Sequence, residues 1–383
     1  MMRDLTTTLG LVDGHSHLRS TSLQSHSVVG SCLEEALLRM TAMSAVDLED
    51  DAFVAACDLV SAGVTGVQVA FHTFQTPEGY LESLNAVIRG LRRSPIRALV
   101  VLMLTDQAEY LPLGASHPHF LPGFLEPGRG VKPQDFPDVV RQAMADNSDI
   151  AFGIGPVAPQ WASDEMLEIL GDLAHSGLRV HAHCLESRYQ RDWAGDSLGR
   201  MQRFGLLGTS VSLAHCVWCS DEELDLIADS GTSLVACPES NRLLRSGQPR
   251  VQEWWKRGIT AAIGMDSATD RVRPIQVASE VLPQTEALLA LTLGGSTATG
   301  LPTDQDEVKW SDLSQGVVSS VRIGGQLVVD SGQLLLHEEC EDARNRITDR
   351  MRQDAPDRAE RQSVLSSIMA DYLGYLDEVD RGS

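Results

Sequence analysis

Lysine is scarce in this sequence, and basic residues as a whole are outnumbered by acidic ones. The 383 residues include 31 lysines and arginines against 53 aspartates and glutamates, which gives a net charge of −22. Only Lys132, Lys256 and Lys309 are lysines. A surface this acidic repels phosphate groups, so nucleic acids and anionic membranes are poor candidates for partners.

Cysteine and long apolar runs are also limited. The seven cysteines are odd in number and irregularly spaced, which argues against a disulfide framework and favours a reducing compartment. The first residues, MMRDLTTTLG, contain no apolar leader segment, and no run reaches the roughly 18 apolar residues that a membrane span requires. The sequence therefore predicts a cytoplasmic protein. With 43% hydrophobic residues, it can build a full core.

Short apolar runs alternate with helical patterns from residue 9 to about residue 300. The runs that predict strands are 9–14, 64–71, 97–104, 150–155, 178–183, 210–215, 232–237 and 259–265. The segments that predict helices are 47–62, 78–92, 135–146, 163–175, 196–206, 220–230, 250–256 and 275–291. Eight strands separated by helices in a chain of this length predict an α/β fold, the (β/α)8 TIM barrel, rather than an open doubly wound sheet.

The rhythm is interrupted once and ends near residue 300. Residues 105–134 are rich in proline and glycine and follow the third strand, where a barrel places its active-site loops. Residues 317–336 predict short strands with a turn at Gly324-Gly325, and a charged helical tail follows with a break at Pro356. We therefore expect a barrel over 1–300, a reduced β appendage over 301–336 and a helical tail over 337–383.

Polar residues mark the carboxyl ends of four predicted strands. Strand one ends in Asp-Gly-His15-Ser-His17, and histidines two apart on an extended segment point the same way. Strand five ends in His181-Ala-His183-Cys-Leu-Glu186, strand six in His215 and strand eight in Asp266. A single strand histidine is more often structural, but a barrel gathers these ends around one cavity. Imidazoles with one carboxylate fit Zn²⁺, and also Fe²⁺.

These segments resemble the amidohydrolase superfamily, in its cytosine deaminase-like branch with the triazine hydrolases. The matching motifs are LVDGHSHL, VHAHCLES, LAHCVWCSDEEL, VACPESNRLLRSG and AAIGMDSATD, in the family's order. The resemblance implies that one metal is held by His15, His17, His183 and Asp266. It implies further that Glu186 is the proton shuttle and that His215 orients water or polarises the substrate. His181 lies two residues before His183 and is expected to pack one layer deeper.

The expected chemistry is hydrolytic. A divalent ion lowers the pKa of a bound water, and the resulting hydroxide attacks an amino-substituted carbon. Asp266 fixes the direction of attack, and Glu186 carries the proton to the leaving amine. Binuclear relatives carry a bridging lysine on strand four, which has none here (DIAFGIGPVAPQW). One metal ion, with zinc preferred to iron, is therefore expected.

Substrate contacts are less well defined by the sequence. His72 closes strand two, Gln160 and Trp161 follow strand four, and Asn241 follows strand seven. Each is a candidate for substrate binding, and each has the alternative of supporting a loop.

The leading hypothesis is a mononuclear metal-dependent aminohydrolase, a deaminase that releases ammonia from an N-heterocycle or amidine. The first alternative is a hydrolase that expels an alkylamine, a halide or an amide nitrogen, because the same attack serves all of them. The second is a non-catalytic barrel scaffold. The expected partner is a small molecule, and self-association stays undecided. Fewer residues precede His15 than in most relatives, which predicts either that the family's small sandwich is reduced to the 317–336 hairpin or that the start of the gene is misassigned.

Overall fold

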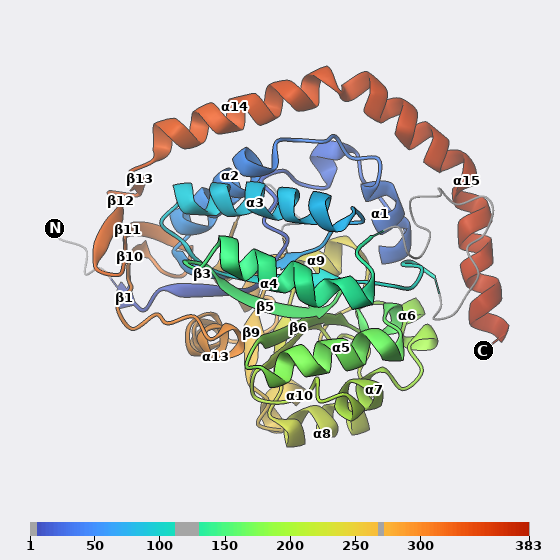
Figure 1. The fold of residues 1–383 in the computed structure, drawn as a ribbon. Coiled ribbons are helices and arrows are strands. Elements are labelled where there is room, and N and C mark those ends of the chain that lie inside the picture. The colour runs from blue at the N-terminus through green and yellow to red at the C-terminus, as the bar shows by residue number, and fades with distance from the viewer. Residues whose placement is uncertain (1–5, 112–129, 267–271, 383) are drawn as a thin grey trace.

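A closed barrel of eight parallel strands forms the centre of the molecule (Figure 1). The structure is a computed structural model that describes residues 6–111, 130–266 and 272–382. The barrel strands run in sequence order and are β2 (Leu11–Ser16), β3 (Val64–Phe71), β4 (Arg97–Leu104), β5 (Ala151–Pro156), β6 (Arg179–Cys184), β7 (Val211–His215), β8 (Ser233–Ala236) and β9 (Ala261–Ile263). All eight predicted strands are present, and the TIM barrel is confirmed.

The barrel closes where the first of these strands meets the segment after the last. Ser16 forms a parallel bridge with Asp266, and the amide of Asp266 donates to the carbonyl of His15 at 2.9 Å. The Asp13 carboxylate accepts from the amides of His15 and Met265 at 3.1 and 2.9 Å. Closure therefore brings two of the predicted ligand-bearing segments into direct contact.

Helices surround the barrel, and side chains start several of them. The helices over the first part of the barrel are α1 (Leu33–Met40), α2 (Leu48–Ser61), α3 (Pro77–Arg93), α4 (Phe136–Asp146), α5 (Asp164–His175), α6 (Arg188–Trp193) and α7 (Ser197–Arg203). Those over the second part are α8 (Asp221–Ser230), α9 (Pro238–Leu243), α10 (Val251–Lys256), α11 (Pro274–Ser279), α12 (Gln284–Leu289) and α13 (Gly295–Thr299). Ser163 caps α5, and Ser220 with Glu223 forms a capping box on α8. The apolar faces of these helices pack on the strands as one continuous core.

Two features of the helical layer differ from the sequence prediction. The continuous helix expected over 275–291 is wrong, because the chain forms α11 and α12 with a break before Gln284. Pro283 lies at this break, where it lacks the amide that a helix interior requires. The short helices α1, α6 and α9 were not predicted, and all three lie next to the carboxyl ends of the strands described below.

A second sheet of five antiparallel strands lies beside the barrel (Figure 1). It is made of β1 (Thr6–Thr8), β10 (Glu307–Asp312), β11 (Val317–Ile323), β12 (Gln326–Asp330) and β13 (Gln333–Leu334). The expected turn at Gly324-Gly325 joins β11 to β12, and both glycines have positive φ, which a two-residue hairpin of this kind requires. The sheet is larger than the predicted hairpin because β1 pairs with β10, with Thr8 opposite Val308.

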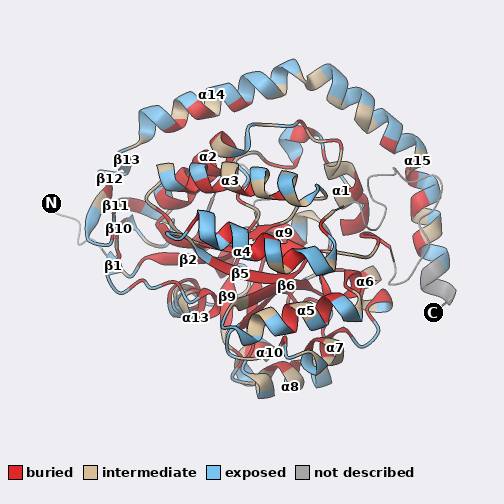
Figure 2. Ribbon diagram, in the orientation of Figure 1, coloured by how far each residue is buried: buried red, intermediate tan, exposed pale blue. Residues whose placement is uncertain are grey.

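Two long helices end the chain and wrap around the barrel. Helix α14 (His337–Gln353) packs on α2, and α15 (Ala355–Gly382) packs on α1 and α6. Figure 2 shows that their outward faces are exposed while their inward faces are partly buried. The break falls at Asp354, and Pro356 occupies the first turn of α15, where a missing amide costs nothing.

No helix among the described residues is both long and apolar enough to cross a membrane. Most of the predicted loop after strand three, residues 112–129, lies outside the described residues.

Candidate active site

The candidate site lies at the carboxyl ends of the barrel strands. His15 is the second-to-last residue of β2, and His17 directly follows that strand. His183 is the second-to-last residue of β6, and His215 is the last residue of β7. Asp266 follows β9. Two of these residues have backbone angles that side chains rarely adopt, with φ of 69° at His215 and 60° at Asp266. Such strain costs on the order of 1–3 kcal/mol per residue and is concentrated at functional sites.

Three histidines and one aspartate converge on a common point. One ligand atom each from His15, His17 and His183 lies within 4.8 Å of the other two. Nε2 of His15 and Nε2 of His17 each lie 3.5 Å from Oδ1 of Asp266, and Nε2 of His17 lies 3.2 Å from Nε2 of His183. The four predicted ligands are therefore placed side by side.

A chain of hydrogen bonds behind His15 determines which of its nitrogens faces the site. His181 donates from Nδ1 to the carbonyl of Ser212 at 3.0 Å, which leaves its Nε2 as an acceptor. That Nε2 lies 2.8 Å from Nδ1 of His15, so His15 donates there and keeps a lone pair on Nε2. His181 thus lies deeper, as the sequence predicts, and it also positions His15, a role that the sequence did not predict.

The same pattern recurs at two further histidines. His183 donates from Nδ1 to the carbonyl of Val157 at 2.7 Å, and His215 donates from Nδ1 to Oδ1 of Asn241 at 2.9 Å. Both rings therefore keep a lone pair on Nε2. Asn241 has no exposed surface and orients His215 from behind.

Burial keeps the imidazoles of His15, His17 and His183 neutral. Burial lowers the pKa of His15, lowers that of His17 to about 3, and holds that of His183 well below its usual range. Burial alone would raise the pKa of Asp266, but its close contact with His15 and the nearby imidazoles of His17 and His215 hold it well below its usual range. The site thus combines neutral nitrogen lone pairs with one carboxylate.

Glu186 lies beside these histidines and Asp266, and its pKa is raised, whereas that of Asp266 is lowered. Its Oε2 is 3.5 Å from Nε2 of His215, and its amide donates to Oε1 of Gln190 at 2.9 Å. Burial raises the pKa of Glu186 to about 7, and the negative charge of Asp266 adds to the increase. A carboxyl group that exchanges its proton near neutral pH is well matched to general acid and base catalysis.

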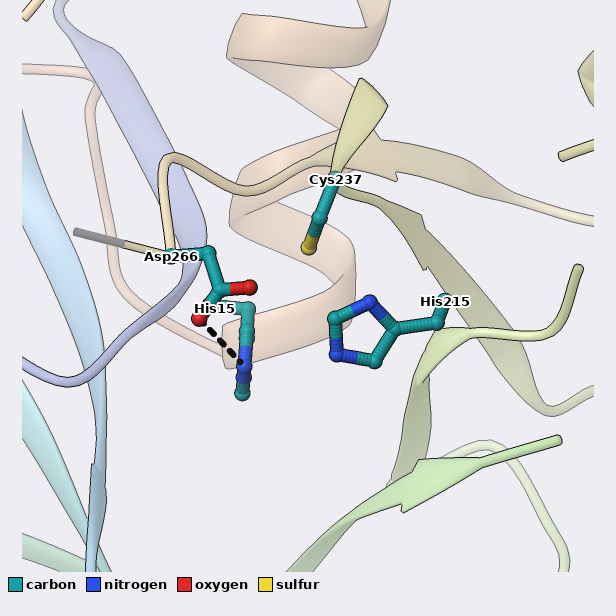
Figure 3. Close-up of side chains that lie close together, drawn as sticks. All are labelled: His15, His215, Cys237 and Asp266. Carbon is teal, nitrogen blue, oxygen red and sulfur yellow. Dashed lines mark ion pairs between the residues drawn. The ribbon is translucent and has the colours of Figure 1, made fainter. Parts of the chain in front are cut away.

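Sequence reasoning missed two residues of this centre, Asp13 and Cys237. Figure 3 shows Cys237 with its sulfur directed toward His15, His215 and Asp266. Burial holds the pKa of the Cys237 thiol well above its usual range, so it stays protonated and is a weaker ligand than the imidazoles. The Asp13 carboxylate accepts hydrogen bonds from two backbone amides. In the sequence, the only signal that could have indicated its role was its position next to the His-x-His motif.

The residues present fit a divalent metal ion. Nε2 of His15 and Nε2 of His215 are buried and have no hydrogen-bond partner among the described residues. Buried polar atoms without partners are rare, and each calls for an explanation such as an ion. Three neutral imidazoles with one carboxylate is a donor set that zinc accepts.

A cavity of about 310 Å³ opens onto this group. His17, His183, Glu186, His215 and Asp266 line it on one side. The remaining wall is largely apolar and is formed in part by Leu33, Leu37, Met40, Phe74, Tyr110 and Leu244. Helix α1, which supplies three of these residues, is thus a wall of the cavity.

The four predicted substrate contacts are placed differently. His72 and Trp161 line the cavity. Asn241 lies behind His215, and Gln160 is fully buried outside the cavity wall, with both amide atoms unpartnered among the described residues.

Comparisons with known proteins agree with this geometry. The profile described as "Amidohydrolase family" matches residues 6–305. A 5-methylthioadenosine/S-adenosylhomocysteine deaminase from Moorella thermoacetica is 26% identical over 324 residues, covering 78% of this chain and 69% of that protein.

Solved structures match over most of their length. An adenosine deaminase from Xanthomonas campestris with bound zinc has a TM-score of 0.70 at 20% identity, covering 90% of this chain and 87% of that one. An atrazine chlorohydrolase from Arthrobacter aurescens, complexed with zinc, has a TM-score of 0.69 at 17% identity and covers 91% and 88%. At these identities the likeness establishes the fold.

Proposed function

Because this chain belongs to the amidohydrolase family, we propose that it is a mononuclear metal-dependent deaminase that hydrolyses the amino-substituted carbon of a 6-aminopurine nucleoside. The observation that carries the proposal is the convergence of three imidazole Nε2 atoms and Asp266 at the cavity wall, next to Glu186. The substrate class is supported by the deaminase from Moorella thermoacetica, which aligns over most of this chain.

The metal centre is assigned to His15, His17, His183 and Asp266. When bound, a divalent ion supplies a water of lowered pKa as the nucleophile. The hydrogen bonds through Nδ1 of His15 and His183 fix both rings, so their lone pairs need no reorientation to bind. Zinc is the metal we expect, with iron as the alternative.

The proton transfers are assigned to Glu186. A carboxylate at this position accepts one proton from the attacking water and gives it to the ring nitrogen of the substrate; it then takes the second proton from the added hydroxyl group and gives it to the departing amine. The pKa of about 7 leaves both forms of Glu186 populated near neutral pH. Ammonia leaves only when the amine is protonated, so this shuttle is essential to turnover.

His215 and Asp266 orient the reacting groups. Nε2 of His215 lies 3.5 Å from Oε2 of Glu186 and faces the cavity, where it can bond the oxygen that becomes negative during attack. Asn241 holds the ring in that orientation. The Asp266 carboxylate accepts a hydrogen bond from the attacking water and sets its direction.

The wider setting of the enzyme is part of the same proposal. We place it in the cytoplasm, since its seven cysteines are all free. Its expected partner is the small-molecule substrate, and its net charge of −22 disfavours nucleic acid.

Two measurements on the purified protein test the proposal. Elemental analysis without added metal is expected to give about one divalent ion per chain, because the donor set fits one ion. Ammonia release is then assayed with adenosine, 5′-deoxyadenosine, 5′-methylthioadenosine and S-adenosylhomocysteine. Two ions per chain would contradict the mononuclear assignment. A product formed with loss of an alkylamine or halide, and none with loss of ammonia, would favour a different leaving group. No metal uptake after incubation with zinc would favour a scaffold.

A further inference from the structure

We propose that Glu109 is a specificity-determining residue, which recognises a hydroxyl or amine donor on the substrate away from the carbon that reacts. The inference rests on the proposed function for the identity of the substrate. It concerns a residue that the sequence does not single out, located after β4 on the cavity wall.

The position of Glu109 is unusual for an acidic side chain. It lines the same cavity as Glu186 and His183, yet the residue is only 2% exposed. Its Oε1 is buried and has no hydrogen-bond partner among the described residues, none of which forms an ion pair with it. The carboxyl group has a hydrogen bond with the Tyr110 side chain, but a buried oxygen without a partner is still costly, and such an atom calls for an explanation such as a ligand.

The backbone around Glu109 is held in a strained conformation. Tyr110 has φ of 65°, which is rare for a bulky residue and is associated with functional sites. Two buried side chains fix this segment: the Tyr372 hydroxyl donates to the carbonyl of Tyr110 at 2.9 Å, and Nε1 of Trp161 donates to the carbonyl of Leu111 at 3.2 Å. Glu109 is therefore positioned by its neighbours before any ligand arrives.

The chemistry of Glu109 defines what it can recognise. Burial raises its pKa to about 8, and the hydrogen bond from Tyr110 opposes this only in part. The group is then largely protonated at neutral pH, and a protonated carboxyl group keeps one carbonyl oxygen that accepts from a substrate hydroxyl or amine. The cavity wall combines apolar side chains such as Leu33 and Phe74 with polar ones such as Arg19 and His72, so only a substrate donor that reaches Oε1 of Glu109 gains this particular contact.

The kinetic test compares Glu109→Leu and the isosteric Glu109→Gln with the wild type and with Glu222→Leu, a matched control at an exposed position on α8. The substrates are adenosine and its 2′-, 3′- and 5′-deoxy analogues, and the pair 5′-methylthioadenosine and S-adenosylhomocysteine. We expect E109L to lower kcat/KM about 10- to 100-fold for compounds with the recognised donor and little for the analogue without it. The deoxy series identifies a hydroxyl, and the second pair identifies an amine.

A uniform loss over all six compounds, or no loss in E109L and E109Q, would overturn the proposal, because a recognition contact must be selective. A wild type that releases no ammonia from any of the six would instead count against the proposed substrate class.

A second measurement needs no substrate. A carboxyl group kept for recognition destabilises the free protein, so E109L is expected to raise the melting temperature of the metal-loaded enzyme, and E222L to leave it unchanged. A melting temperature that stays level or falls in E109L, with E109Q behaving likewise, would show that Glu109 is a structural residue and would end the proposal.

Discussion

In three histidines at the centre of the barrel, a hydrogen bond to one ring nitrogen determines which nitrogen faces the site. In His15, His183 and His215, a hydrogen bond at Nδ1 commits one nitrogen and leaves Nε2 free to face the same region. For His15 the acceptor of that bond is another histidine, His181, which therefore acts on the site by orienting His15 rather than by direct contact. The two kinds of histidine should differ in what their removal does.

We expect His183→Ala to lower metal content per chain, because it removes a ligand. His181→Asn should still fill with metal at saturation but bind it about 10- to 100-fold more weakly, because only the support of His15 is lost. Titration with zinc against a chelator measures both, and His337→Ala, at an exposed position on α14, is the control. Unchanged metal affinity in the His183 variant would show that the ligand set is misassigned.

Glu186→Gln tests the proton shuttle at the same scale. The amide keeps the shape of the side chain but cannot carry a proton, so turnover should fall by about 10²–10⁴-fold while metal content and melting temperature are kept. Glu222→Gln, at an exposed position, provides the matched control. Turnover close to that of the wild type in the Glu186 variant would refute the assignment.

The pH profile follows from the same residue. Burial raises the pKa of Glu186 to about 7, so its proton-accepting carboxylate form is lost as the pH falls through that value. A bound cation lowers this pKa, so we expect kcat/KM to decline about tenfold per unit on the acid side, with the midpoint at or below pH 7. Measurement between pH 5 and 9 checks it. A profile that is level down to pH 5 would contradict the role.

At the scale of elements, helix α15 does not line the cavity but contacts residues that form its wall. Its buried face packs on α1, and Tyr372 bonds the backbone of Tyr110, next to Glu109. A helix at the far end of the sequence from His15 thus holds the cavity wall in place.

Tyr372→Phe should disturb this wall more than a comparable loss elsewhere on α15. The change leaves the buried carbonyl of Tyr110 unpaired, which costs about 1–3 kcal/mol. We expect KM to rise and the melting temperature to fall, with kcat less affected. Tyr189→Phe, which breaks the bond from α6 to Asp377 on the same helix, is the control. Equal behaviour of the two variants would show that Tyr372 has no special link to the cavity.

At the scale of the whole molecule, buried titratable groups set the pH of greatest stability. Burial raises the pKa of Asp13 and Glu109 to about 8 and of Glu34 to about 7, above their values in the unfolded chain, so their protonated forms favour folding. That contribution is fully present below the unfolded pKa values of about 4, is lost progressively as the pH rises, and is gone above the folded values of about 7 to 8. Burial lowers the pKa of His17 to about 3 and of His72 to about 4, so their contribution is lost as the pH falls below 6.5.

The melting temperature of the metal-free protein should therefore fall as the pH rises from about 6.5 to 8, because the histidines no longer change charge there while the buried carboxyl groups still lose their contribution. Melting temperatures between pH 5.5 and 8.5, measured after chelation, test this, and the alkaline decline should be smaller in E109L. A melting temperature that climbs steadily up to pH 8.5 would contradict the assigned burial of these carboxyl groups.

The barrel and the proximity of the proposed ligands were predictable because each of their signals is local. Most barrel strands are rich in apolar residues, and His15, His183, His215 and Asp266 each lie at or just after the carboxyl end of a barrel strand. The strand ends of a barrel meet at one face, so local order was sufficient to predict proximity.

Other features depend on contacts between distant segments. Strand β1 is three threonines with no apolar alternation, and it is a strand because β10 pairs with it. Glu109 lies in a stretch without periodicity, and its burial depends on Tyr372 and Trp161, which are far away in the chain. No local pattern encodes such contacts, so the small sheet and the cavity wall could be found only in the structure.

The closure of the barrel between Ser16 and Asp266 also has a consequence for biosynthesis. The ribosome makes His15 and His17 early, and at about 5–20 residues per second the aspartate that completes the set follows them by on the order of tens of seconds. During that interval the nascent chain has only part of its metal ligands. The complete ligand geometry that selects between metals is then absent, so an ion with higher affinity for histidine, such as copper, is not excluded. Correct loading is therefore expected to follow release from the ribosome, and the cell's supply of free metal at that moment to determine which ion the enzyme carries.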